Sequence, residues 1–296
     1  MNEKATLKSS LKAYIYLLPA LSVIVLFSIY PIFRSFDMAF HVDYNFLQRT
    51  VYSRGFDNFV TLWNDSRFWL AIRNTFTFVL GVVPIQIGIS LCIALMLNSN
   101  IKAKGVFRSI YFLPFVTSVV AISMVWQFVF HTQNGILNDI IGLFGFDPIP
   151  WLGSSDYAMT SLIIMSIWRG LGFNIVILLA GLQNVDKGLH LAAKVDGARA
   201  WHRFTTVTLP ALSPTLFFIS IMGVISSFRV FTEVYNLFRG DPGPGQRALT
   251  VVFYVVQTFR NRSFGVSSAA AIVLFAIIFT FTMIQMYVGK KLVHYN

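Results

Sequence analysis

The chain alternates between long stretches without charged residues and short polar connectors. Five windows contain no Asp, Glu, Lys or Arg over the roughly 20 residues that a helix needs to cross a bilayer, and Arg169 alone interrupts a sixth. The first window lacks the small-residue cleavage site of a signal peptide, so we expect it to be retained. The pattern predicts six transmembrane helices, at about 13–33, 75–98, 109–130, 157–181, 211–234 and 265–288.

Composition supports a lipid environment. Of the 296 residues, 56% are hydrophobic and only 12% are charged, and the mean hydropathy is +0.67. Soluble domains have about 25% charged residues. We therefore expect an all-α integral membrane protein with one transmembrane domain over 1–296. The single cysteine, Cys92, and five scattered histidines predict neither an internal disulfide nor a metal site, and no catalytic constellation is evident.

The net charge of +11 is unevenly distributed along the chain. All nine lysines lie at the two termini, in the connector between the second and third helices, or in the connector between the fourth and fifth: Lys4, Lys8, Lys12, Lys102, Lys104, Lys187, Lys194, Lys290 and Lys291. Because basic residues in short loops stay on the cytoplasmic side, both termini are predicted to be cytoplasmic. The charge is then a topology signal, and nucleic acid is not an expected partner.

Two connectors on the predicted outer side have structure of their own. The connector at 34–73 contains several Phe and Trp residues, which suit an interfacial amphipathic helix. The connector at 131–156 is interrupted by Gly and Pro, which favours a folded turn with one short helix.

The connector at 183–210 is longer and more patterned than a link between two helices requires. Asp186 suits a helix N-cap, Gly197 interrupts the apolar pattern, and helical character resumes over 198–204 before Pro210. Its small residues allow a partner to approach closely, which predicts a docking helix. An amphipathic helix lying on the bilayer is the alternative interpretation.

The residue order of this connector resembles the loop signature of the inner-membrane permeases of binding-protein-dependent ABC importers. The signature is Glu-Ala-Ala, three residues, Gly, about nine residues, then Ile-x-Leu-Pro. Its counterparts here are Leu191, Ala192, Ala193, Asp196, Gly197, Ala198, Phe204, Leu209 and Pro210. Leu191 replaces the glutamate of the signature, and Val207 replaces its isoleucine.

The resemblance extends over nearly the whole chain and is closest to the sugar-uptake branch, as in maltose-, lactose- and glycerol-phosphate-type permeases. The matching residues include Leu18-Pro19-Ala20, Tyr30-Pro31, Asn74-Thr75, Phe112-Leu113-Pro114, Gly172-Phe173-Asn174, Ala180-Gly181-Leu182 and Pro242-Gly243.

This resemblance implies a type I ABC importer permease with six transmembrane helices, in which a coupling helix between the fourth and fifth seats in a cytoplasmic ATPase. The implied partners are a second homologous permease, two ATPase subunits, an extracytoplasmic solute-binding protein, a carbohydrate solute and membrane lipids. The chain has no GxxxxGK[ST] phosphate-binding loop, so ATP and Mg are expected on the partner subunits, and the chain is expected to be a transport subunit and not an enzyme.

Ionisable residues inside predicted spans are costly and therefore functional candidates. Arg229 and Glu233 are four residues apart and are predicted to pair on one helix face, whereas Arg169 has no acidic neighbour in sequence. A hydrated cavity lined by aromatic and amide side chains would suit a sugar, and two arginines facing it would favour an anionic solute. Each aromatic or amide candidate also fits a packing or interfacial role. The candidates for the solute path are Trp126, Gln127, Trp168, Arg169, Asn174, Arg229, Glu233, Tyr235, Asn236 and Gln257.

The sequence thus predicts a permease subunit of an ATP-driven carbohydrate importer in the cell inner membrane. The alternative is an ion-coupled secondary carrier of a small solute. Such a carrier would need an intramembrane carboxylate, for which Glu233 is the candidate.

Overall fold

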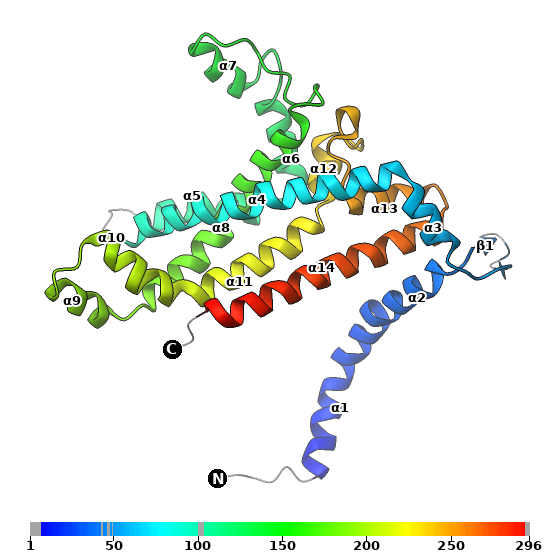
Figure 1. Cartoon of the computed structure of the whole chain (residues 1–296), viewed down its shortest axis with the longest axis horizontal. Helices are drawn as coiled ribbons and strands as arrows, with labels where there is room; N and C mark the ends of the chain where they lie inside the picture. The colour runs from blue at the N-terminus through cyan, green and yellow to red at the C-terminus, as the bar shows by residue number, and fades with distance from the viewer. Residues whose placement is uncertain (1–6, 43, 46–47, 49, 100–103, 294–296) are drawn as a thin grey trace. The chain divides into compact units, whose positions relative to one another are not determined.

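The described residues are predominantly helical (Figure 1). The computed structural model describes residues 7–42, 44–45, 48, 50–99 and 104–293. Lys4 and Lys102, two of the lysines on which the predicted orientation depends, lie outside the described residues. The all-α fold class is confirmed, and the exception in the described part is one antiparallel pair of strands with two residues each.

The described residues group into two compact units, and the first consists of the chain up to Asp65 together with Val255–Val273. It holds the end of α13 (Val251–Arg260) and the start of α14 (Phe264–Leu292). Its remaining elements are α1 (Leu7–Ile24), the π-helical turn η1 (Val25–Ile29), α2 (Tyr30–Ala39), the antiparallel strands β1 (Tyr44–Asn45) and β2 (Thr50–Val51), and α3 (Asp57–Asn64).

The second unit comprises Ser66–Tyr254 and the chain from Leu274 onward. Its complete elements are α4 (Ser66–Asn98), α5 (Lys104–Val116), α6 (Val119–Val129), α7 (Ile136–Leu143), α8 (Ala158–Gln183), α9 (Lys187–Val195), α10 (Ala200–Arg203), the π-helical turn η2 (Phe204–Thr208), α11 (Leu209–Phe228), α12 (Thr232–Leu237) and the 3₁₀ turn η3 (Pro244–Gln246).

The helices long and apolar enough to cross a bilayer occur where the apolar windows predict them. In the described part of the chain there are five, or six if one bent pair forms a single span. They are Tyr14–Ala39, Ser66–Asn98, the pair Lys104–Val116 and Val119–Val129, Ala158–Gln183, Ala200–Phe228 and Phe264–Lys291. The short helix α7 lies in the connector at 131–156, where one short helix was expected.

The bent pair corrects the prediction of one continuous third span at 109–130. The chain turns by 102° between α5 and α6. Pro114 removes one backbone donor from the last turn of α5, and the hydroxyl of Thr117 donates to the Leu113 carbonyl at 2.7 Å. Ser118 then adopts a non-helical ψ of 133°. Apolar composition predicted the span but could not reveal this break.

The core of the second unit lies where α4, α8 and α11 pack side by side (Figure 1). Its buried cluster is Ala94, Leu97, Ile175, Leu178, Leu179, Leu182, Leu212 and Ile219. Two glycines of α8 permit the close packing. A Cβ at Gly181 would lie 2.7 Å from the Thr215 hydroxyl, and a Cβ at Gly172 would collide with the backbone carbonyl of Tyr111 on α5.

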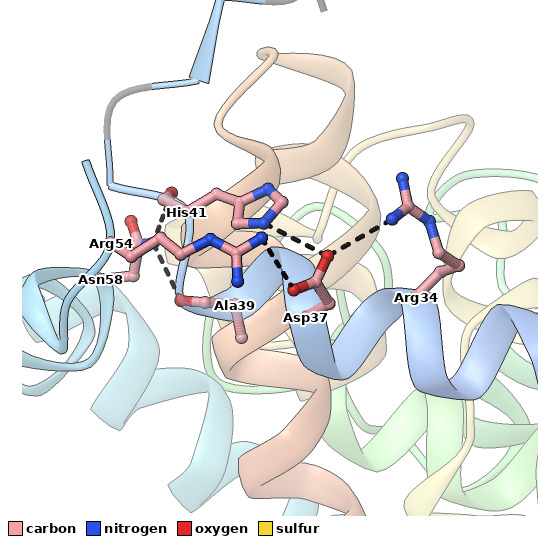
Figure 2. Close-up of polar contacts among 6 residues, drawn as sticks. All are labelled: Arg34, Asp37, Ala39, His41, Arg54 and Asn58. Atoms are coloured by element: carbon pink, nitrogen blue, oxygen red, sulfur yellow. Dashed lines mark hydrogen bonds and ion pairs between the residues drawn. The ribbon is translucent and has the colours of Figure 1, made fainter. Parts of the chain in front are cut away.

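A polar network in the first unit centres on Asp37, near the end of α2 (Figure 2). Its carboxylate lies 3.3 Å from Arg34 Nη1, 3.4 Å from Arg54 Nη2 and 3.2 Å from Nε2 of the buried His41. Asp37 is thus shared by α2 and the segment after β2, so it fixes the path of the chain beyond α2.

Asn58 of α3 completes this anchor (Figure 2). Its buried amide donates to the carbonyl oxygens of Ala39 and His41, at 2.9 Å each. Ala39 is the last residue of α2 and His41 lies just beyond it, so neither carbonyl has a partner within the helix. Gly265 at the start of α14 packs against the Asn58 side chain so closely that a Cβ there would overlap the amide.

Candidate functional site

A cavity of about 390 Å³ opens among α4, α8, α11 and α12 in the second unit. We call it the Arg169 pocket. Its polar lining is Gln86, Ser166, Arg169, Asn174, Ser226, Ser227 and Glu233. Phe78, Val82, Phe115, Phe173, Met222 and Val230 supply the apolar part of the wall. Of the predicted solute-path residues, Arg169, Asn174 and Glu233 are therefore brought together.

The Arg169 pocket contains an ion pair between two helices. Arg169 Nη1 donates to Glu233 Oε1 at 2.9 Å, and the two side chains are 27% and 18% exposed. Burial makes each charge costly alone, and pairing reduces that cost. The predicted pair of Arg229 with Glu233 is thus wrong in its partner, because the acid meets an arginine 64 positions away in the sequence.

A break in the fifth predicted helix explains why the wrong partner was predicted for Glu233. The prediction assumed a continuous fifth span to 234, but α11 ends at Phe228 and Phe231 departs from helical geometry, with φ −144° and ψ −53°. The Thr250 hydroxyl donates to the carbonyl of Val230 at 2.9 Å, which satisfies a group that the break releases. Residues on either side of the break no longer share one helix face, so the i,i+4 rule does not apply.

Two polar atoms of residues that line the Arg169 pocket are buried without a partner in the described part of the chain. Ser166 Oγ and Arg169 Nε are buried and have no hydrogen-bond partner within the described ranges. Gly170 lets the Gln86 amide pack against the α8 backbone, since a Cβ there would overlap it. Buried polar groups without partners are costly, so a bound polar solute or water would stabilise this arrangement.

The remaining candidates lie outside the lining of the Arg169 pocket. Trp126 and Trp168 contact each other edge to face, with ring centroids 5.5 Å apart. Gln127 donates to the Asn236 carbonyl at 2.7 Å. The Tyr235 ring packs against Phe231 and Phe253. Arg229 is exposed at the end of α11, and Gln257 belongs to the first unit.

The connector at 183–210 folds as a kinked helical segment. Asp186 caps α9 as predicted, accepting from the Gly188 N–H at 2.7 Å. Gly197 has φ of +77°, a left-handed conformation that favours glycine, and it separates α9 from α10. The helix resumes at Ala200 and does not end before Pro210, which occupies the first turn of α11.

This segment presents apolar side chains to its surroundings. Val195 is 87% exposed and Trp201 is 73% exposed, and Leu191 is also exposed. Arg203 stabilises the kink by donating from Nη1 to the Ala198 carbonyl at 2.9 Å. A short, well-capped segment with exposed apolar residues has the properties of a docking element.

Residues 86–294 match the family model described as "Binding-protein-dependent transport system inner membrane component". The chain belongs to this family. It is therefore a multi-pass permease component of an inner-membrane transport system, and the matched region includes the 183–210 connector and the lining of the Arg169 pocket except Phe78 and Val82.

Relatives align with this permease from end to end. A lactose transport system permease protein of Rhizobium radiobacter is 35% identical, over 97% of this chain and 98% of that protein. A trehalose/maltose transport system permease protein of Thermococcus litoralis is 29% identical, over 98% and 97%. The fold is that of a bacterial ABC transporter chain involved in alginate import, with a TM-score of 0.84 at 23% identity, over 97% of this permease and 98% of that chain.

Sequence reasoning missed four polar residues that line the Arg169 pocket: Gln86, Ser166, Ser226 and Ser227. All four are polar residues within predicted spans, and that polarity was the available signal. Their convergence on one cavity depends on how α4, α8 and α11 pack, which a single sequence does not specify.

Proposed function

We propose that this permease carries a carbohydrate and forms half of a translocation pathway, with a second homologous permease as the other half. The observation that carries the proposal is the Arg169 pocket, a cavity among apolar helices whose buried polar atoms, Ser166 Oγ and Arg169 Nε, have no partner among the described residues. A sugar hydroxyl can accept from the Arg169 Nε–H, and it can either donate to or accept from the Ser166 hydroxyl. The end-to-end likeness to permeases named for lactose and for trehalose or maltose supports the sugar class.

The anionic solute considered from sequence is not favoured by this arrangement. Glu233 neutralises Arg169 at 2.9 Å, and Arg229 is not among the residues that line the pocket. A neutral polyhydroxylated solute fits a pocket whose charges are already paired.

Uptake measurements test the proposal. Deleting the gene should abolish uptake of at least one of labelled lactose, maltose and arabinotriose, and the wild-type chain should restore it. Ser166→Leu fills the Arg169 pocket and should not restore uptake at normal membrane levels. Ser109→Leu, at an exposed position outside the pocket, should restore it. Undiminished uptake of all three sugars in the deletion strain would contradict the carbohydrate assignment.

In the same proposal, the segment from α9 to η2 docks on a cytoplasmic ATPase, and two such subunits bind ATP and Mg. Exposed Val195 and Trp201 supply apolar contact, and the small residues Ala192 and Ala193 allow close approach. Ala193→Trp should leave membrane insertion intact but abolish coupled uptake and co-purification of the ATPase. Normal uptake by a stably inserted Ala193→Trp chain would contradict the docking role.

The proposed orientation places both termini and this docking segment in the cytoplasm, because the lysines gather there. The connectors on the opposite face then receive an extracytoplasmic solute-binding protein. A secondary carrier is less favoured: its coupling carboxylate would have to bind and release an ion, yet Glu233 is held by Arg169.

A further inference from the structure

A second cavity, of about 510 Å³, lies at the other end of α12. We call it the Arg239 pocket. Its polar side chains are Gln127, His131, Thr132, Arg239 and Asp241. Its volume is within the range of small-molecule sites, about 300–1,000 Å³. Sequence analysis singled out only Gln127 among these residues.

His131 presents a hydrogen-bond donor in this pocket. Its Nδ1 accepts from the backbone N–H groups of Gln133 at 3.3 Å and Asn134 at 3.2 Å. In a neutral imidazole the proton is then on Nε2. The loop after α6 thus fixes both the ring and its tautomer.

Arg239 is held in place by its neighbours. It is a non-glycine residue with φ of 55°, a conformation that persists only where the surroundings impose it. Its Nε donates to Gln127 Oε1 at 3.3 Å, and Gln127 in turn donates to the Asn236 carbonyl at 2.7 Å. The bond to Gln127 uses Nε of Arg239, so the two terminal nitrogens of this exposed guanidinium can face a ligand.

The Arg239 pocket is lined by hydrogen-bond donors, by an acceptor and by apolar side chains. Asp241 is an exposed acceptor, and Phe130 and Leu237 are buried beneath the cavity. Arginine alone would favour an anion, but a carboxylate in the same cavity opposes a second negative charge. A neutral polyol, whose hydroxyls both donate and accept, matches this mixture.

The same short helix lines both cavities. Glu233, in the first turn of α12, borders the Arg169 pocket, whereas Leu237 at its end and Arg239 just beyond border the Arg239 pocket. A helix of six residues is about 9 Å long. A solute leaving one pocket would therefore need to move only a short distance to reach the other.

We propose that the Arg239 pocket is a separate binding subsite for a neutral sugar ring on the same path as the Arg169 pocket. Arg239 and the His131 Nε2–H donate to sugar hydroxyls, and Asp241 accepts from them. This assignment rests on the proposed carbohydrate function.

Cysteine protection tests the subsite independently of transport. In a Cys92→Ser background, Thr132→Cys places a thiol in the pocket wall, and Leu143→Cys places one at a site 85% exposed and outside it. Membranes holding the complete transporter are sonicated, so that a maleimide reaches both faces, and labelling is timed with and without lactose, maltose or arabinotriose. Uptake of each sugar is measured in the parent cells.

A sugar that the cells take up should slow labelling of Thr132→Cys at least threefold and leave Leu143→Cys unchanged. Adding Arg239→Gln should raise the sugar concentration needed for half-protection about tenfold, since a hydrogen bond to a charged group is lost. Arg247→Gln, exposed in the same connector but outside the lining, should not raise it.

Each contrary result has a distinct meaning. Uptake of a sugar that does not protect Thr132→Cys would overturn the subsite and leave the proposed function standing. Protection that Arg239→Gln does not weaken would overturn the assigned recognition. If the wild-type cells take up none of the three sugars, the carbohydrate function itself fails, and the subsite with it.

Discussion

The ion pair between Arg169 and Glu233 yields a quantitative prediction about stability. Replacing either residue with glutamine leaves the other as a partly buried charge without its partner, whereas replacing both removes both charges. The two single variants should therefore be clearly less stable than the wild type, and the double variant should lose distinctly less stability than the sum of the two single losses.

The size of the expected loss of stability follows from the distance and the exposure of the ion pair. At 2.9 Å and an effective dielectric constant near 20, the Coulomb attraction is about 6 kcal/mol. Desolvation of both groups offsets much of this, although exposures of 27% and 18% leave each group some hydration. We expect each single substitution to cost about 3 kcal/mol and the coupling energy between the two sites to be roughly 2 kcal/mol.

Thermal unfolding of the detergent-solubilised transporter provides the assay. At roughly 2 °C or more per kcal/mol, each single variant should lower the Tm by about 6 °C, and the double variant by distinctly less than the sum. The same ranking should appear in urea, where the midpoint shifts at constant slope. Strict additivity of the two single losses would refute the interpretation that these residues form an energetically coupled pair.

Three further substitutions test the packing of the fold. Gly172→Ala should lower stability by about 1–3 kcal/mol, because its Cβ would meet the α5 backbone, whereas Gly88→Ala, with open space around the Cβ, should not; equal thermal shifts would contradict this packing. Gly197→Ala should cost about 1 kcal/mol through its positive φ alone and increase proteolysis of the 183–210 connector, and Gly105→Ala, also in open space, is the control. Asn58→Ala should cost about 1–3 kcal/mol by leaving two carbonyls without donors, and unchanged protease sensitivity of residues 40–56 would argue against the anchor.

Much of the helical framework was predictable because it depends on residues that are close together in the sequence. Apolar windows located the long helices because a charge-free stretch of sufficient length is itself the requirement for crossing a bilayer. Asp186 and Gly197 marked the start and the kink of the helical segment in the 183–210 connector, since a cap and a left-handed residue act through their own backbone neighbours. The family resemblance of the 183–210 connector agreed with the family later matched over 86–294.

The breaks in the third and fifth spans were not predictable in the same way. Hydropathy averages over a window, and the break after Thr117 lies inside a charge-free stretch. The break in the fifth span follows Phe228, where Arg229 ends the charge-free stretch, but a single charged residue does not by itself predict that a helix ends. At Thr117 the break depends on a hydroxyl that bonds to its own helix, and at Val230 it depends on a donor from Thr250, which lies 20 residues further along the chain. Side-chain bonds of this kind redirect a helix without changing its composition.

The pairing of Arg169 with Glu233 is a consequence of the second break. In an unbroken helix Glu233 would lie on the same face as Arg229, at a spacing that favours a pair on the helix surface. Once the helix ends at Phe228, α12 is free to take its own direction, and its two ends are fixed by side chains from other helices: Arg169 of α8 and Gln127 of α6. A polar residue in a membrane helix thus indicates where a break can be stabilised, but its partner emerges only when the helices are packed. The charges that a sequence assigns to one helix face can therefore come to connect two helices, and here that connection closes one wall of the cavity proposed to hold the solute.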